Sequence, residues 1–105
     1  MKSLETHHLK KIKTFCQDHC QSILIEKSKK DIEYSRGLYK GFIYGIKSMN
    51  YLLSQTNIHI KKADLYIHFK EQQQIIQCAK FKEGNFNAGV KDSIYKIMNL
   101  VSTQE

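Results

Sequence analysis

The sequence predicts an all-α fold, a small single-domain antiparallel bundle of about four helices over residues 1–105. The chain has 105 residues, of which 41% are hydrophobic, so it can bury a modest core without disulfides or a structural metal. It has no proline and only five glycines, which disfavours a turn-dense β-sandwich. Apolar residues recur at intervals of three and four in successive segments, as they do on one face of a helix. The alternative is an α+β fold with a short β-hairpin around residues 58–81.

The first expected helix covers about residues 4–25. Its apolar stripe consists of Leu9, Ile12, Cys16, Cys20 and Ile23. Charged and amide side chains occupy the opposite side, so this helix is expected to bury one face only.

The second expected helix, about residues 29–55, combines an apolar line with a line of very small residues. The apolar line consists of Leu38, Phe42, Ile46, Met49 and Leu53. Gly37, Gly41 and Gly45 are spaced four apart, and Ser48 continues their line. Each glycine costs a helix interior about 1 kcal/mol relative to alanine, so an offsetting interaction is expected. The preferred interpretation is a tight helix crossing, inside the fold or across a homodimer, because small residues let two backbones approach. A partner-docking groove and a kinked or broken helix are the alternatives.

Residues 56–82 carry two competing patterns. Helical spacing is found at Leu65, Phe69, Gln72, Ile76 and Ala79. Alternating apolar residues at 58–60 and 65–69 are typical of strands instead. Because no glycine, proline, Asn-Gly or Asp-Gly separates these two runs, a third helix is expected rather than a hairpin.

The last expected helix covers about residues 88–101 and follows a loop at residues 83–87. Gly84 suits the end of the preceding helix, and Asn87 suits the N-cap of the next one. The buried face is expected to contain Val90, Ile94, Ile97, Met98 and Val101.

The chain carries a formal charge of +7, concentrated in residues 1–54, which hold ten cationic and five acidic residues. All cationic residues except Arg36 are lysine. Lysine neutralises phosphate as a point charge but lacks the planar fork that reads guanine edges, so any attraction to nucleic acid is expected to be largely non-specific. The candidate site for nucleic acid or an acidic partner consists of Lys27, Lys29, Lys30, Arg36, Lys40, Tyr44, Lys47 and Tyr51. The alternative is a set of solvated lysines that keep the protein soluble, with the tyrosines half-buried beside the core.

Catalytic and membrane-spanning functions find no support in the sequence. The longest uncharged run, residues 48–60, has thirteen residues, whereas a membrane span needs roughly 20 apolar residues. Paired carboxylates in an apolar setting, a nucleophile elbow and a phosphate-binding loop after a strand are all missing. We therefore expect neither an enzyme nor a bound cofactor.

Cys16, His19 and Cys20 form the one candidate metal-binding set, because their spacing places them about one helical turn apart. This spacing matches no common zinc motif, and free cysteine on an apolar helix face is usually a small core residue. No metal is therefore expected. The odd number of cysteines, three in all, points to free thiols in a reducing cytoplasm.

Two functional hypotheses follow. The first is a small basic non-enzymatic binding protein, an accessory regulator or inhibitor that acts on nucleic acid or on a nucleic-acid-handling machine. Its lysine-rich, proline-free composition resembles that of small phage- or plasmid-borne proteins of low-GC genomes. The second is a protein–protein interaction module, such as an immunity or anti-defence factor, that docks on one protein target or on its own copy through the helix bearing Gly37, Gly41 and Gly45.

Overall fold

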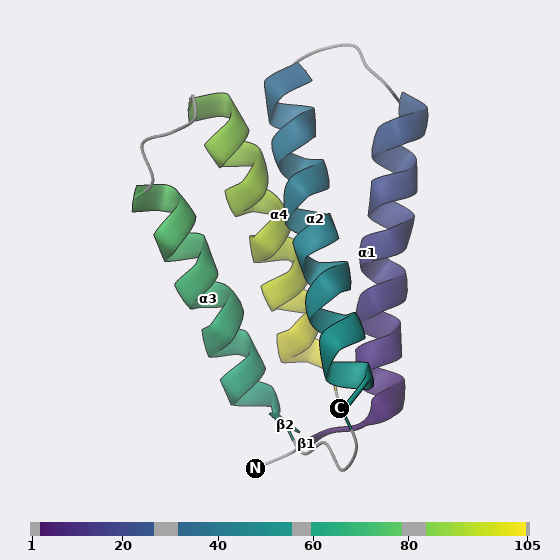
Figure 1. The fold of residues 1–105 in the computed structure, drawn as a ribbon. Coiled ribbons are helices and arrows are strands. Elements are labelled where there is room, and N and C mark those ends of the chain that lie inside the picture. The colour runs from purple at the N-terminus through teal and green to yellow at the C-terminus, as the bar shows by residue number, and fades with distance from the viewer. Residues whose placement is uncertain (1–2, 27–31, 56–59, 79–83, 105) are drawn as a thin grey trace.

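A computed structural model describes residues 3–26, 32–55, 60–78 and 84–104. Within these residues the elements are β1 (Ser3–Leu4), α1 (Thr6–Glu26), α2 (Ile32–Leu53), β2 (Ile60–Lys61), α3 (Lys62–Cys78) and α4 (Gly84–Thr103). The helices alternate in direction along the chain, so α1 and α3 run one way and α2 and α4 the other (Figure 1). The predicted all-α fold is confirmed.

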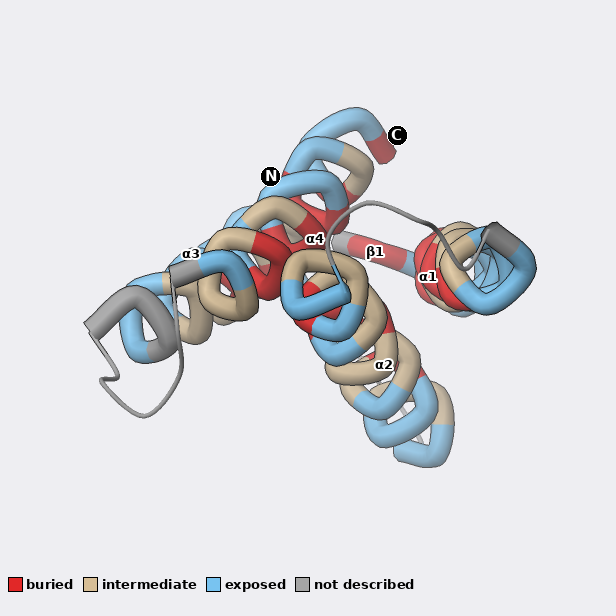
Figure 2. The backbone as a smooth tube through the Cα atoms, turned by 90° about the horizontal axis from the view of Figure 1, so that it is seen from above, coloured by how far each residue is buried: buried red, intermediate tan, exposed pale blue. Residues whose placement is uncertain are grey.

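The centre of the bundle is the parallel pair α2 and α4, which share the largest helix contact in the fold. Seen from above, α1 and α3 lie on opposite sides of this pair, with α1 against α2 and α3 against α4 (Figure 2). The molecule is accordingly flattened, with extents of 41 × 30 × 22 Å. In an up–down bundle of four helices, α2 and α4 lie diagonally opposite each other. Such a pair makes a large contact only when its facing residues are small, because ordinary side chains hold helix axes 8–10 Å apart or more.

The small residues of α2 provide this contact. A Cβ atom placed on Gly37 would lie 2.9 Å from the backbone nitrogen of Val90, and one on Gly89 would lie 2.8 Å from that of Leu38. One turn further along, a Cβ on Gly41 would lie 2.8 Å from the Cβ of Ser93. Separations below 3.0 Å are essentially never seen for real Cβ atoms, so α2 and α4 meet backbone to backbone along this line.

The core follows the predicted apolar stripes. Its fully buried large side chains include Leu9, Ile12, Phe42, Met49, Leu65, Phe69, Ile94, Ile97 and Val101. A hydrogen bond ties the start of α2 to α4, where the Tyr34 hydroxyl donates to Asp92 Oδ2 at 2.6 Å. This bond, together with burial and the nearby charge of Asp92, raises the pKa of Tyr34 to about 12.

The third helix expected in this region is present as α3, and the alternative hairpin around residues 58–81 is absent from its described residues, 60–78, because residues 65–69 lie within α3. Ile60 does lie in a two-residue strand, but the strand pairs antiparallel with the N-terminus, Ser3 opposite Lys61 and Leu4 opposite Ile60. Leu4 is buried there, at 2% exposure, so it caps the apolar end of the bundle. The first helix therefore begins at Thr6, later than expected.

The predicted loop at residues 83–87 is wrong over its described part, because α4 begins at Gly84 and continues to Thr103. Asn87 consequently lies inside the first turn and is no N-cap. The longer helix lets Phe86 pack on the core and places Gly89 against α2. Both contacts favour helix over the local loop signal of glycine and asparagine.

Candidate functional site

Arg36, Lys40, Lys47 and Tyr51 lie along one face of α2, because separations of four, seven and four residues return to nearly the same side of a helix. All four side chains are exposed, Tyr51 at 65%. We call these residues the α2 strip. Its cations extend over about 16 Å at 1.5 Å per residue. The other three predicted cations, Lys27, Lys29 and Lys30, lie outside the described residues.

The cations of the α2 strip are available for a partner. Arg36 makes an ion pair with Glu33 at 3.5 Å, and both side chains are largely solvent-exposed, so this pair is weak. Lys40 and Lys47 make no ion pair with any acidic group in the described part of the chain. Lys40 and Lys47 thus present uncompensated positive charge to solvent, and the charge of Arg36 is only weakly offset by Glu33.

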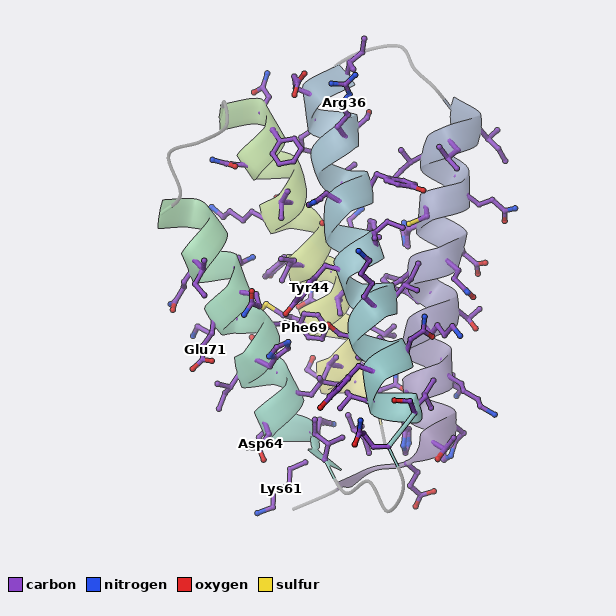
Figure 3. The ribbon with its side chains drawn as sticks, viewed as in Figure 1. Arg36, Tyr44, Lys61, Asp64, Phe69 and Glu71 are labelled. Atoms are coloured by element: carbon purple, nitrogen blue, oxygen red, sulfur yellow. The ribbon has the colours of Figure 1, made fainter. Side chains whose placement is uncertain are left out.

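Tyr44 belongs to the predicted site but turns toward α3 instead of solvent (Figure 3). Its hydroxyl and Nε2 of His68 are hydrogen-bonded at 2.7 Å, and its ring meets the Phe69 ring edge-on with centroids 5.9 Å apart. Burial raises the pKa of Tyr44, and a hydrogen bond with Ser48 opposes that rise. Tyr44 is therefore part of the wall between α2 and α3.

A pocket of about 430 Å³ opens between α2 and α3, beside the α2 strip. Its lining residues are Tyr44, Lys47, Ser48, Tyr51, Leu52, Ile60, Leu65 and His68. The pocket exists because α3 packs on α4 and leaves its flank toward α2 incompletely filled. Three predicted site residues, Tyr44, Lys47 and Tyr51, meet here.

Sequence reasoning missed the residues that β2 and α3 contribute to this pocket. Ile60 and Leu65 follow an ordinary apolar pattern, and His68 carries no motif. A signal existed only in the helical spacing of Leu65 and His68, which places both on one side of α3.

The small-residue line of α2 lies on a different face from the α2 strip. Gly37, Gly41 and Gly45 are buried, and α4 covers them within the same chain. At Gly45 the α1 helix contributes as well, because an added Cβ would lie 2.7 Å from Cys16 Sγ. Ser48, the fourth member, lines the pocket. The face that a protein partner would use in the docking hypothesis is therefore already occupied by α4.

The candidate metal residues of α1 have separate packing environments. The His19 ring lies 4.6 Å from that of Phe42, nearly parallel to it, and 4.5 Å from that of Phe15. Cys16 and Cys20 are free and buried, and burial together with Cys20 raises the pKa of Cys16 to about 12. Across the described ranges, no three histidine, cysteine or acidic side chains are grouped as metal ligands. Cys16 fills the space beside Gly45 that a larger residue could not occupy.

Acidification is expected to weaken the fold through His19. Burial lowers its pKa from the ordinary 6.5, the nearby Lys96 lowers it further, and Asp18 partly opposes the shift. The unfolded chain therefore takes up this proton first as pH falls below 6.5, so stability declines until the pH passes the folded-state pKa. Urea unfolding of the wild type and His19→Phe between neutral and acidic pH measures this. We expect a flatter pH profile of stability for His19→Phe than for the wild type. Identical profiles for the two proteins would contradict the assignment.

Comparison of the chain with protein-family models, with curated proteins and with solved structures gave no match. Among the described helices, none combines the length and the apolar character that crossing a membrane requires.

Proposed function

We propose that the protein is a small basic non-enzymatic binding protein that binds single-stranded nucleic acid along the α2 strip. In this role it would be an accessory regulator or inhibitor of nucleic-acid handling. The observation that carries the proposal is the alignment of Arg36, Lys40 and Lys47 with the exposed ring of Tyr51, beside a pocket walled by tyrosine and histidine.

The charge supports a phosphate backbone as the partner. Phosphates spaced along a strand can be neutralised by successive cations along one helix face, and the released counterions make such binding strongly salt-dependent. Arg36 is the single arginine of the chain and lies beside Glu33, so few groups are suited to reading base edges. The expected affinity is accordingly broad in sequence.

The exposed ring supports a single strand over a duplex. Bases of a single strand can stack on aromatic side chains, whereas those of a duplex are stacked on each other. Tyr51 is 65% exposed and lies one turn from Lys47, so a phosphate contact and a stacking contact are adjacent. We further propose a cytoplasmic location, a reducing compartment with which the free thiols of Cys16 and Cys20 agree.

Fluorescence anisotropy with labelled single-stranded DNA and RNA tests the proposal. We expect measurable binding at low salt, with log K falling against log salt at a slope of roughly −2, since three cations each contribute about −0.7 for a single strand. A duplex of the same length is the control and is expected to bind more weakly. No binding at low salt, or binding that does not change with salt, would refute the proposal.

A further inference from the structure

We infer that the pocket between α2 and α3 receives one unpaired base of a strand bound along the α2 strip. This inference rests on the proposed function and specifies its ligand. The pocket would add an enclosed base contact to the phosphate contacts of the α2 strip and to stacking on Tyr51.

The size of the pocket favours a small flat group. Its volume is about 430 Å³, and it is bounded by α2 on one side, α3 on the other and Ile60 of β2 at one end. A peptide helix with its side chains is about 10–12 Å across and would need a groove that runs the length of the bundle. A single base needs no such groove, and it presents two apolar faces that suit the side chains of Leu52 and Leu65.

The cations of the α2 strip would guide a nucleic-acid strand past the pocket. Lys47 lines the pocket and lies one helical turn from both Tyr44 and Tyr51. From Lys47 the cationic line continues away from the pocket through Lys40 to Arg36. A strand whose phosphates follow these cations thus passes the pocket mouth at Lys47, where one base can turn inward.

The pocket lining favours stacking over hydrogen bonding. Most of this lining is apolar, and the Tyr44 hydroxyl and Nε2 of His68 are already hydrogen-bonded to each other at 2.7 Å. A base in the pocket would therefore be held chiefly through its flat faces, without strong base preference, in agreement with the expected broad sequence range.

Two oligonucleotides separate base insertion from phosphate contact. The first carries the fluorescent base 2-aminopurine at successive positions, and the second has the same phosphates but abasic sites throughout. We expect the wild type to quench 2-aminopurine through stacking. We also expect the abasic strand to bind about 5- to 150-fold more weakly than the normal strand, the range for loss of one stacked base.

The matched variants are Tyr51→Ala and Tyr51→Phe, at a position exposed enough to leave the fold intact. Tyr51→Phe keeps the ring and should quench 2-aminopurine fluorescence as the wild type does. Tyr51→Ala should quench this fluorescence less, and it should bind the abasic strand with the affinity of the wild type. Equal, salt-dependent binding of normal and abasic strands would overturn base insertion and stacking on Tyr51, but leave phosphate binding along the α2 strip standing. An acidic peptide that displaces the normal strand at equal charge concentration would overturn the inference in favour of a protein ligand. Absence of binding to either strand would overturn both proposals.

Discussion

Gly37→Leu is expected to lower the free energy of unfolding by about 3 kcal/mol, the upper end of the usual range for overpacking. The first added carbon would lie 2.9 Å from the nitrogen of Val90 and 3.0 Å from Cα of Gly89, and both are backbone atoms. A flexible side chain could rotate away from such a clash, but a helix backbone cannot. The helices α2 and α4 would have to separate, and the largest contact of the bundle would be lost. Circular dichroism with urea unfolding measures the effect, with Asn50→Leu at an exposed position of α2 as the control.

The smaller change Gly37→Ala tests whether an added Cβ raises or lowers the free energy of unfolding. In a helix interior without a close neighbour, alanine in place of glycine stabilises by about 1 kcal/mol. Here the same change should destabilise, because the Cβ is the atom that meets α4. A stabilised Gly37→Ala protein would show that α2 and α4 are not in backbone contact.

The helices were predictable because each carries a long run at helical spacing. Leu9, Ile12 and Cys16 in α1, or Val90 and Ile94 in α4, recur at three or four residues and are fully or almost fully buried. Such periodicity is a local property, so it identifies the buried face without knowledge of the partner. Helix ends were less predictable, since Gly84 and Asn87 are local loop signals that packing against α2 overrides.

The partner of the glycines was not predictable from α2 alone. Three glycines at spacing four require a close neighbour but do not specify whether it lies in the same chain. A complementary signal was present in the last helix, where Gly89 and Ser93 are also four apart and oppose Gly37 and Gly41. Two small-residue lines in one chain favour a crossing within that chain.

The strand pairing and the pocket depend on residues far apart in sequence. Ser3 and Leu4 pair with Lys61 and Ile60, a contact of two residues that leaves no detectable pattern. The candidate site was predictable only where helical spacing determines it, at the α2 strip. The position of Tyr44 depends on His68 of α3, so its hydrogen bond and the pocket beside it follow from tertiary packing.

Neutralising part of the α2 strip is expected to have the largest effect on binding. Each lysine contributes by releasing counterions from the phosphate it contacts, and Lys40 and Lys47 have no described acidic neighbour that would reduce this. The double variant Lys40→Gln/Lys47→Gln should therefore lose affinity for single-stranded DNA at least about tenfold at low salt.

A second double variant tests whether the position of the lost charges matters or only their number. Lys10→Gln/Lys11→Gln removes the same number of charges from exposed positions of α1. The α1 helix lies on the opposite side of α2 from α3 (Figure 2). The decisive measurement is the salt dependence of single-strand affinity for the wild type and both double variants, with urea unfolding to confirm that all three are folded. We predict that the slope of log K against log salt becomes shallower by roughly 1.4 for the α2 pair, at about 0.7 per lost phosphate contact, and that it stays near the wild-type value for the α1 pair. Equal slopes for the two variants would contradict a binding site on α2, because net charge alone would then account for the attraction.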